Sequence, residues 1–247
     1  MKNLKDYVIE SVWDIEDNVE SDNKEFVLNG VKQFIKDNYP NANPNSLTFV
    51  FDEEKEKYIV STRGGLRLST EAKSLTNGLF EWGVVGGFFN CDNCPELESL
   101  EGAPKTIGEY FDCHGCKKLE SLKGAPKTVG GVFSCFGCNE LKSLKGAPEY
   151  VGWNFYCSNC SKLESLKGAP KTVGAAFNCS GCTKLTSLEG APKTIGEYFD
   201  CHGCKKLESL KGSPKTVGGY FDCQNCPKLS SLDGIGKVKG KIFSDIK

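Results

Sequence analysis

A 22-residue repeat runs through the chain from Phe89 to Phe243, and the alignment of its copies needs no gaps. Each repeat reads Phe-x-Cys-x-x-Cys-x-x-Leu-x-x-Leu and then closes with Gly-Ala-Pro, or once Gly-Ser-Pro, and a Val or Ile before Gly. A fixed period in the twenties is typical of solenoids, in which a turn too small to bury its own apolar face packs on its neighbours. The period therefore restricts this chain to a stack of nearly identical turns.

Within one repeat, Phe-x-Cys alternates with period two, as a short strand with one buried face does. We expect Phe and the first Cys to point inward, and the residues before, between and after them to point outward. Stacking of seven turns then predicts a parallel sheet with a strand spacing of about 4.8 Å and a length of roughly 34 Å. The Leu-x-x-Leu segment fills the core on the returning side, and the Gly-x-Pro segment suits a tight corner.

All 14 cysteines lie in the repeats, two in each complete turn. They are Cys91, Cys94, Cys113, Cys116, Cys135, Cys138, Cys157, Cys160, Cys179, Cys182, Cys201, Cys204, Cys223 and Cys226. A free cysteine packs as a small apolar residue, so we expect core positions. The spacing C-x2-C-x18-C-x2-C also fits a zinc site, which stays open as the alternative. Disulfides are disfavoured because stacked identical cysteines point in parallel.

Residues 1–62 differ from the rest and predict an α+β cap, which a solenoid needs to cover its first turn. A stripe of Leu4, Val8, Val12, Ile15 and Val19 predicts an amphipathic helix over residues 2–19. This helix is alternatively a docking or targeting segment.

A capping box at Asp22 and Glu25 predicts a second helix that ends near Tyr39-Pro40. Residues 47–51 and 58–62 read as two strands joined by a charged loop. We expect four segments: an N-terminal cap (1–62), a degenerate first repeat (63–85) with Ser69 and Ala72 at the cysteine positions, seven repeats (86–240) and a C-terminal capping strand (241–247).

The repeat resembles the leucine-rich repeat family. The Phe-x-Cys-x-x-Cys-x-x-Leu-x-x-Leu pattern matches the family's Leu-x-Leu-x-x-Asn/Cys core over about 160 of the 247 residues. Cys stands where the family usually has Leu, and Gly where a leading Leu is usual. The resemblance implies an α+β fold: a leucine-rich-repeat solenoid with a parallel β-sheet, capped by an N-terminal helical and hairpin region.

The Ala-Pro-Lys-Thr-Val-Gly turn is similar to short repeats of bacterial effectors and surface proteins, and to solenoids encoded by large tailed phages. The phage resemblance implies a host protein as the partner, inhibition as the effect and the host cytoplasm as the location.

Four outward strand positions vary between repeats, whereas the inward Phe, Cys and Leu hardly change. A constant core under a variable face is how a solenoid presents a binding surface. This face has several aromatic side chains, and aromatic residues are enriched among interface anchors. We expect these positions to bind a partner protein: Tyr110, Asp112, His114, Phe136, Trp153, Asn154, Tyr156, Tyr198, Asp200, His202, Tyr220 and Asp222. Two alternatives remain: neutral drift of exposed positions, and a structural or adhesive module that binds carbohydrate.

No set of residues with catalytic spacing stands out, and Cys113 should be buried beside its own His114. We therefore expect no enzyme activity, no catalytic residues, no metal and no cofactor. Asp112 and His114 share a strand face, so the pair is an alternative site for a metal or a ligand proton. A column of lysines, Lys105, Lys127, Lys171, Lys193 and Lys215, is an alternative site for an anionic polymer.

The composition argues against other partners. The net charge is −1, with −6 in residues 1–60 and therefore +5 in the remainder, too mild to imply nucleic acid. No apolar run approaches the ~20 residues that cross a bilayer, and the N-terminal segment lacks the apolar core of a secretory signal. These observations predict a cytoplasmic protein with no membrane partner. The oligomeric state stays open, with a homodimer through the C-terminal end as one arrangement.

Overall fold

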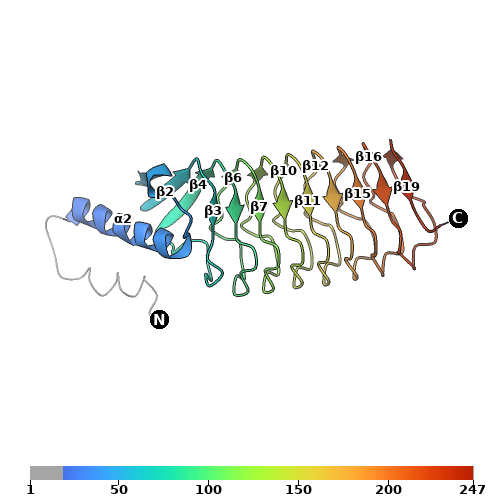
Figure 1. The fold of residues 1–247 in the computed structure, drawn as a ribbon, viewed down its shortest axis with the longest axis horizontal. Helices are drawn as coiled ribbons and strands as arrows, with labels where there is room; N and C mark the ends of the chain where they lie inside the picture. Colours follow the sequence, from blue (N-terminus) through green and yellow to red (C-terminus); the bar gives the residue numbers. More distant parts are fainter. Residues whose placement is uncertain (1–18, 247) are drawn as a thin grey trace.

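The computed structural model describes residues 19–246, with side chains from residue 23 onward. A helix and a hairpin stand at one end, and a row of stacked turns extends from them to the C-terminus (Figure 1). The predicted solenoid is confirmed. The helix predicted over residues 2–19 lies outside the described residues except for Val19.

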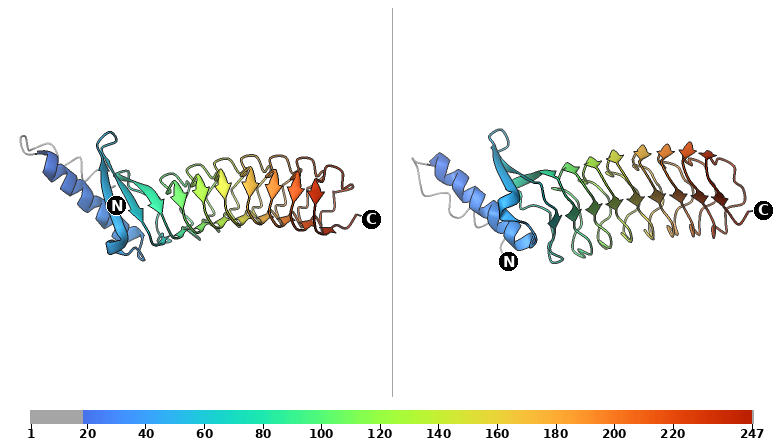
Figure 2. Two further views of the ribbon diagram at one scale, coloured as in Figure 1. Left: turned by 90° about the horizontal axis from the view of Figure 1, so that it is seen from above. Right: turned by 45° about the horizontal axis from the view of Figure 1, so that its top comes forward.

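Two sheets, not the single predicted sheet, run the length of the solenoid on opposite sides of its core (Figure 2). The predicted one, which we call the Phe sheet, contains in the described chain β3 Leu66–Arg67, β5 Phe89–Asn90, β7 Phe111–Asp112, β9 Phe133–Ser134, β11 Phe155–Tyr156, β13 Phe177–Asn178, β15 Phe199–Asp200, β17 Phe221–Asp222 and β19 Ile242–Phe243. All its neighbouring strands pair in parallel.

The second sheet, which we call the Thr-Val sheet, comes from the segment after Gly-Ala-Pro. It contains in the described chain β1 Leu47–Asp52, β2 Lys57–Thr62, β4 Phe80–Val85, β6 Thr106–Ile107, β8 Thr128–Val129, β10 Tyr150–Val151, β12 Thr172–Val173, β14 Thr194–Ile195, β16 Thr216–Val217 and β18 Lys237–Val238. Its Val or Ile is buried in each turn from β6 to β16, and the Thr faces outward. The Val or Ile before Gly is therefore a core residue as well as part of a turn.

The core between the sheets is a set of ladders of identical side chains. The buried phenylalanines from Phe89 to Phe221 stack ring on ring, with centroids 5.1–5.5 Å apart in successive turns. Both cysteines and both leucines of the repeat are buried beside them in nearly every turn. The predicted inward direction of Phe and the first Cys is confirmed.

Two backbone positions explain residues that the motif leaves unexplained. The residue just before the second Cys has a positive φ in every complete turn, between 51° and 70°, and is always Asn or Gly. Those two residues tolerate the left-handed region best. At the corner between the sheets, a Cβ on Gly152 would lie 2.0 Å from the carbonyl oxygen of Gly130. Only glycine therefore lets successive turns stack at this corner.

The N-terminal cap closes the first turn with aromatic rings. Helix α2 spans Val19–Asn38, a short 3-10 helix spans Pro44–Ser46, and β1 and β2 form an antiparallel hairpin that confirms the two predicted strands. Tyr39, directly after α2, donates a hydrogen bond from its hydroxyl to Leu75 O at 2.7 Å, and its ring meets Trp82 edge-on at 5.2 Å. Helix α2 already includes Asp22, so the prediction that a capping box starts the helix there is wrong.

The gapless 22-residue alignment is wrong at both ends of the solenoid. At the first turn, Leu66 pairs with Phe89, so the strand begins one position earlier than the period requires, and Leu68 takes the first cysteine position instead of Ser69. At the last turn, Phe221 pairs with Ile242, again one position early, so Phe243 is not in the Phe column. One residue is therefore added in the first turn and one is lost in the last.

Candidate functional site

The twelve predicted site residues occupy four outward positions around Phe: two before, one before, one after and three after it. All four belong to the outer surface of the Phe sheet, which we call the Phe-sheet face. Trp153, Phe136 and Tyr220 are exposed, at 65%, 42% and 37% of their surface, and His202 is exposed too. The other eight are partly buried.

The aspartates of this face have a local structural role. In Asp112, Asp200 and Asp222, Oδ1 accepts a hydrogen bond from the backbone N–H two residues on, at 3.0, 2.8 and 2.9 Å. Asn90 and Asn178 accept the same bond. Such Asx turns explain the recurrence of Asp or Asn at this position by local backbone structure, with no need for a bound partner protein.

Asp200 and Asp222 are paired residues of neighbouring strands, so two carboxylates lie side by side. Burial raises the pKa of Asp200, the hydrogen bond from the His202 backbone opposes this rise, and the carboxylate of Asp222 adds to it.

Three of the predicted tyrosines pack on rings in adjacent turns. Tyr110 stacks on Phe88 with centroids 5.0 Å apart, and Tyr198 stacks on Tyr220 at 4.8 Å. Tyr220 also meets Phe243 edge-on at 5.7 Å. Aromatic pairs of this geometry stabilise by about 0.5–1.5 kcal/mol beyond the area they bury. These rings therefore hold neighbouring turns together, whatever else they do.

Asn154 and Tyr156 are also engaged within the molecule. The amide of Asn154 accepts a hydrogen bond from the backbone N–H of Ala176 at 3.0 Å and donates one to the hydroxyl of Tyr156 at 2.8 Å. Burial first, and then a hydrogen bond with Tyr156, raise the pKa of Tyr198. These three side chains form one polar cluster across turns four to six.

Trp153 and Phe136 remain without such a role. Trp153 lies between Gly131 and Ala175 of the adjacent turns, and Phe136 lies between His114 and Ser158. Neither ring stacks on another ring within the described part of the chain. They are large apolar side chains that stay partly in water, at 42% and 65% of their surface for Phe136 and Trp153, without a ring contact to offset that exposure.

Sequence reasoning did not place Tyr150, an exposed aromatic residue of the second sheet, in the candidate site. Tyr150 lies in β10 of the Thr-Val sheet, where the neighbouring strands carry Thr128 and Thr172, and 51% of its surface is exposed. The available signal is the interruption of an otherwise regular threonine column, in a segment whose neighbouring Pro and Gly predict a turn and not a strand.

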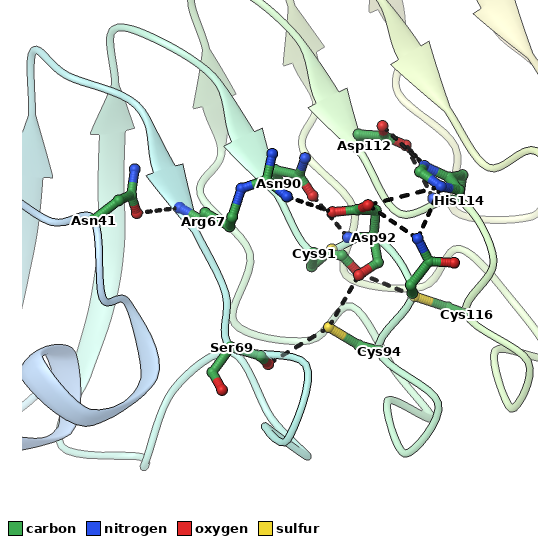
Figure 3. Close-up of polar contacts among 11 residues, drawn as sticks. Asn41, Arg67, Ser69, Asn90, Cys91, Asp92, Cys94, Asp112, His114 and Cys116 are labelled. Carbon is green, nitrogen blue, oxygen red and sulfur yellow. Dashed lines mark hydrogen bonds and ion pairs between the residues drawn. The ribbon is translucent and has the colours of Figure 1, made fainter.

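The two histidines have different surroundings, although each lies in an identical 18-residue stretch. His114 Nδ1 lies 3.1 Å from both carboxylate oxygens of Asp112, and its Nε2 lies 3.1 Å from Asn93 Nδ2 and 3.7 Å from Asp92 (Figure 3). Asp92 in turn pairs with Arg67 at 3.1 Å.

His202 has only a 3.5 Å contact to Asn225 on its ring. Within residues 23–246, no three His, Cys, Asp or Glu side chains are arranged to hold a metal ion. The Asp/His pair is thus satisfied by neighbouring side chains of turns one and two.

The cysteines are buried free thiols, as their expected core role requires. The second cysteine of a turn lies with its thiol next to the carbonyl of the first cysteine one turn earlier, for example Cys160 to Cys135 at 3.2 Å. Burial raises the pKa of Cys157 well above its ordinary value. Protonated thiols of this kind are poor nucleophiles and poor metal ligands.

The lysine column borders the Thr-Val sheet. Lys105, Lys127, Lys171, Lys193 and Lys215 are all exposed. Lysines of other columns form ion pairs with a glutamate one turn earlier, such as Lys211 with Glu189 at 2.8 Å. The column is interrupted in the fourth turn, where Glu149 replaces lysine.

Comparison with known proteins gives no assignment. No protein-family model matches this chain, and neither the curated proteins nor the solved structures include a match. No helix in the described residues is long and apolar enough to span a bilayer. Any functional conclusion therefore rests on the geometry of the Phe-sheet face.

Proposed function

We propose that this protein is a non-enzymatic solenoid that recognises a partner protein through the Phe-sheet face. The observation that carries the proposal is the exposure of Trp153 and Phe136, two large rings that pack on no other ring in the described chain. Interface energy concentrates in such aromatic anchors, which gain most when a partner removes them from water. The stacked tyrosines and Asx-turn aspartates around them form a rigid frame.

The solenoid is of the leucine-rich-repeat kind in this proposal, since the complete turns before the last keep the 22-residue period and every complete turn has two leucines that pack in or against the core. The separate resemblance of the Ala-Pro-Lys-Thr-Val-Gly turn to phage-encoded solenoids supplies the expected partner, a host protein that the solenoid inhibits. Free thiols in every complete turn favour a reducing compartment for that encounter.

The test uses substitutions that neighbouring turns already tolerate. Phe136→Ser introduces the residue of turns four and five, and Trp153→Ala that of turn five. We expect the double variant to keep its thermal midpoint and lose the partner that the natural chain captures from a lysate. Phe26→Ala, which removes an exposed ring from α2, is the matched control and should retain capture.

Equal capture by the double variant would contradict the proposal. Binding of glycans by the natural chain, with no protein captured and with loss of glycan binding in the double variant, would support the carbohydrate-binding alternative instead.

A further inference from the structure

We count as the fourth turn the one that contains β10 and the following strand β11. It differs from the others at neighbouring outward positions. Glu149 stands where five other turns have lysine, and Tyr150 where those turns have threonine. Trp153 stands where the column otherwise holds only Gly, Ala or Glu. The inward residues Val151, Phe155 and Cys157 follow the repeat, so the changes alter the surface and leave the core as it is.

These changes lie on both sides of one corner. Tyr150 faces outward from β10 of the Thr-Val sheet, and Trp153 stands just before β11 of the Phe sheet. The buried Val151 and the corner residue Gly152 separate them. Three residues of extended chain span roughly 10 Å. The two rings therefore form a ridge that belongs to both sheets.

Nothing in the described part of the chain explains the exposure of the ridge. Tyr150 is flanked by Thr128 and Thr172, and Trp153 by Gly131 and Ala175, so neither has a neighbouring ring to stack on. The ridge also lies in the fourth of seven complete turns, and β10 and β11 are in the middle of the row (Figure 1). Interface anchors cluster near the centre of a binding surface, surrounded by contacts of little energy.

We propose that the partner protein grips the fourth turn across this corner, enclosing Tyr150 and Trp153 in a single interface that covers parts of both sheets. This proposal rests on the proposed function and extends it to a residue outside the Phe-sheet face. The partner must offer an apolar groove that fits over a ridge, because a flat surface laid on one sheet would leave the other ring in water.

The charge of the Phe-sheet face identifies the partner's chemistry. Its four outward positions in the seven complete turns contain no Lys or Arg and six acids: Asp92, Glu109, Asp112, Glu197, Asp200 and Asp222. The lysine column lies on the other side of the corner. Complementary charge steers association and suppresses wrong partners. All six acids lie in turns one, two, six and seven, on either side of the ridge. The partner is therefore a protein whose groove is flanked by basic residues where it reaches those turns of the Phe sheet.

The experiment uses the full chain with benzoylphenylalanine at position 150, 153 or 194, in the cells that make the protein. Position 194 is the threonine position of β14, two turns away on the same sheet. We expect one protein to be cross-linked from both 150 and 153 and not from 194. Its affinity for the unmodified chain is then compared with its affinity for Tyr150→Thr, Trp153→Ala and Thr194→Ala.

Tyr150→Thr restores the residue of five other turns, so folding is preserved by design. We expect about a tenfold or greater loss of affinity for Tyr150→Thr and for Trp153→Ala, no change for Thr194→Ala, and weaker binding as sodium chloride is raised.

A partner that is cross-linked only from 153 and binds Tyr150→Thr normally would overturn the ridge and leave the proposed function standing. Affinity unchanged in both ring variants, or no cross-link from either position, would overturn both proposals. Affinity insensitive to salt would refute the basic groove.

Discussion

The two ends of the solenoid differ in how they cover the apolar core of the terminal turn. At the N-terminal end, Tyr39 and Trp82 are almost fully buried and close the first turn with rings and hydrogen bonds to Leu75 O. At the C-terminal end, Ile242 and Phe243 of the last strand are exposed, at 42% and 38% of their surface. Packed side chains cover the N-terminal end, whereas the C-terminal end leaves two apolar side chains partly exposed to water.

The difference shows how each end avoids unwanted strand addition. The hairpin and α2 cover the core of the first turn. The last turn has Lys237, Lys239 and Lys241 beside its edge strands β18 and β19. Charged lysines are a common way to keep an open edge from pairing. A homodimer through this end stays a prediction, and these lysines oppose it.

The largest expected effect is loss of the fold in alkali. Burial raises the pKa of the thiols, to about 11 for Cys94, to about 12 for Cys226 and well above its ordinary value for Cys157. Thiols of the unfolded chain ionise near pH 8.5. Because the folded pKa is the higher one, this stability is fully present below pH about 8.5 and is lost as pH rises toward the folded values.

Each such thiol contributes a slope of about 1.4 kcal/mol per pH unit, so many together should unfold the solenoid between about pH 9 and pH 11. Circular dichroism across that range measures the loss. Hydrogen exchange at pH 9 should show opening first in the last turn, around Cys223 and Cys226, and not at the capped end. A free energy of unfolding that stays constant up to pH 11 would contradict this account.

The second prediction compares ring removal at the two ends. Trp82→Ala should destabilise by about 3–5 kcal/mol, because the buried indole packs on Tyr39 and Phe80. Phe243→Ala should cost less, about 1 kcal/mol, since 38% of its surface is already in water and its one ring contact is with Tyr220. Urea unfolding of both variants measures the difference. Similar losses of unfolding free energy in the two variants would mean that the side chains of the last turn are packed in solution as closely as those of the cap.

The third prediction compares equivalent thiols in an interior turn and in the last turn. Cys160→Ala removes a fully buried side chain and its 3.2 Å hydrogen bond to Cys135 O, and should cost about 1–3 kcal/mol. Cys226→Ala removes the equivalent contact to Cys201 O where one neighbouring turn is less complete, and should cost less. The midpoints of urea unfolding give both values, and the opposite order would reject a solenoid weakened toward its C-terminus.

The interior of the fold could be predicted from the sequence because identical columns repeat, and each column faces either the core or the solvent. The ends could not. Leu68 is buried at the first cysteine position and Ile242 pairs with Phe221, whereas the fixed period assigns these two positions to Ser69 and Phe243. The Thr-Val sheet could not be predicted in the same way, because only one residue of each of its short strands, the Val or Ile, is buried, and the nearby Pro and Gly indicate a turn.

The candidate site was located by its variable columns, but variation alone did not separate its members. Asp112 and Asp200 are bound in Asx turns and Tyr198 in a ring stack, contacts that depend on residues two positions or one turn away. Trp153 looked no different in the alignment, yet its flanking Gly131 and Ala175 leave it without a partner ring. Comparing each column turn by turn would have found this.

The smallest expected effect tests the difference between the site residues that pack on rings of adjacent turns and Trp153, which does not. Tyr220→Ala should destabilise by about 0.5–1.5 kcal/mol, because it removes the stack on Tyr198 and the edge contact with Phe243. Trp153→Ala should leave the free energy of unfolding nearly unchanged, since the indole is mostly exposed and stacks on nothing. Urea unfolding compares the two, with Tyr110→Ala as a second member of the stacked class. If Trp153→Ala proved the more destabilising variant, its ring would be a structural part of the fourth turn, and the Phe-sheet face would lose its central anchor.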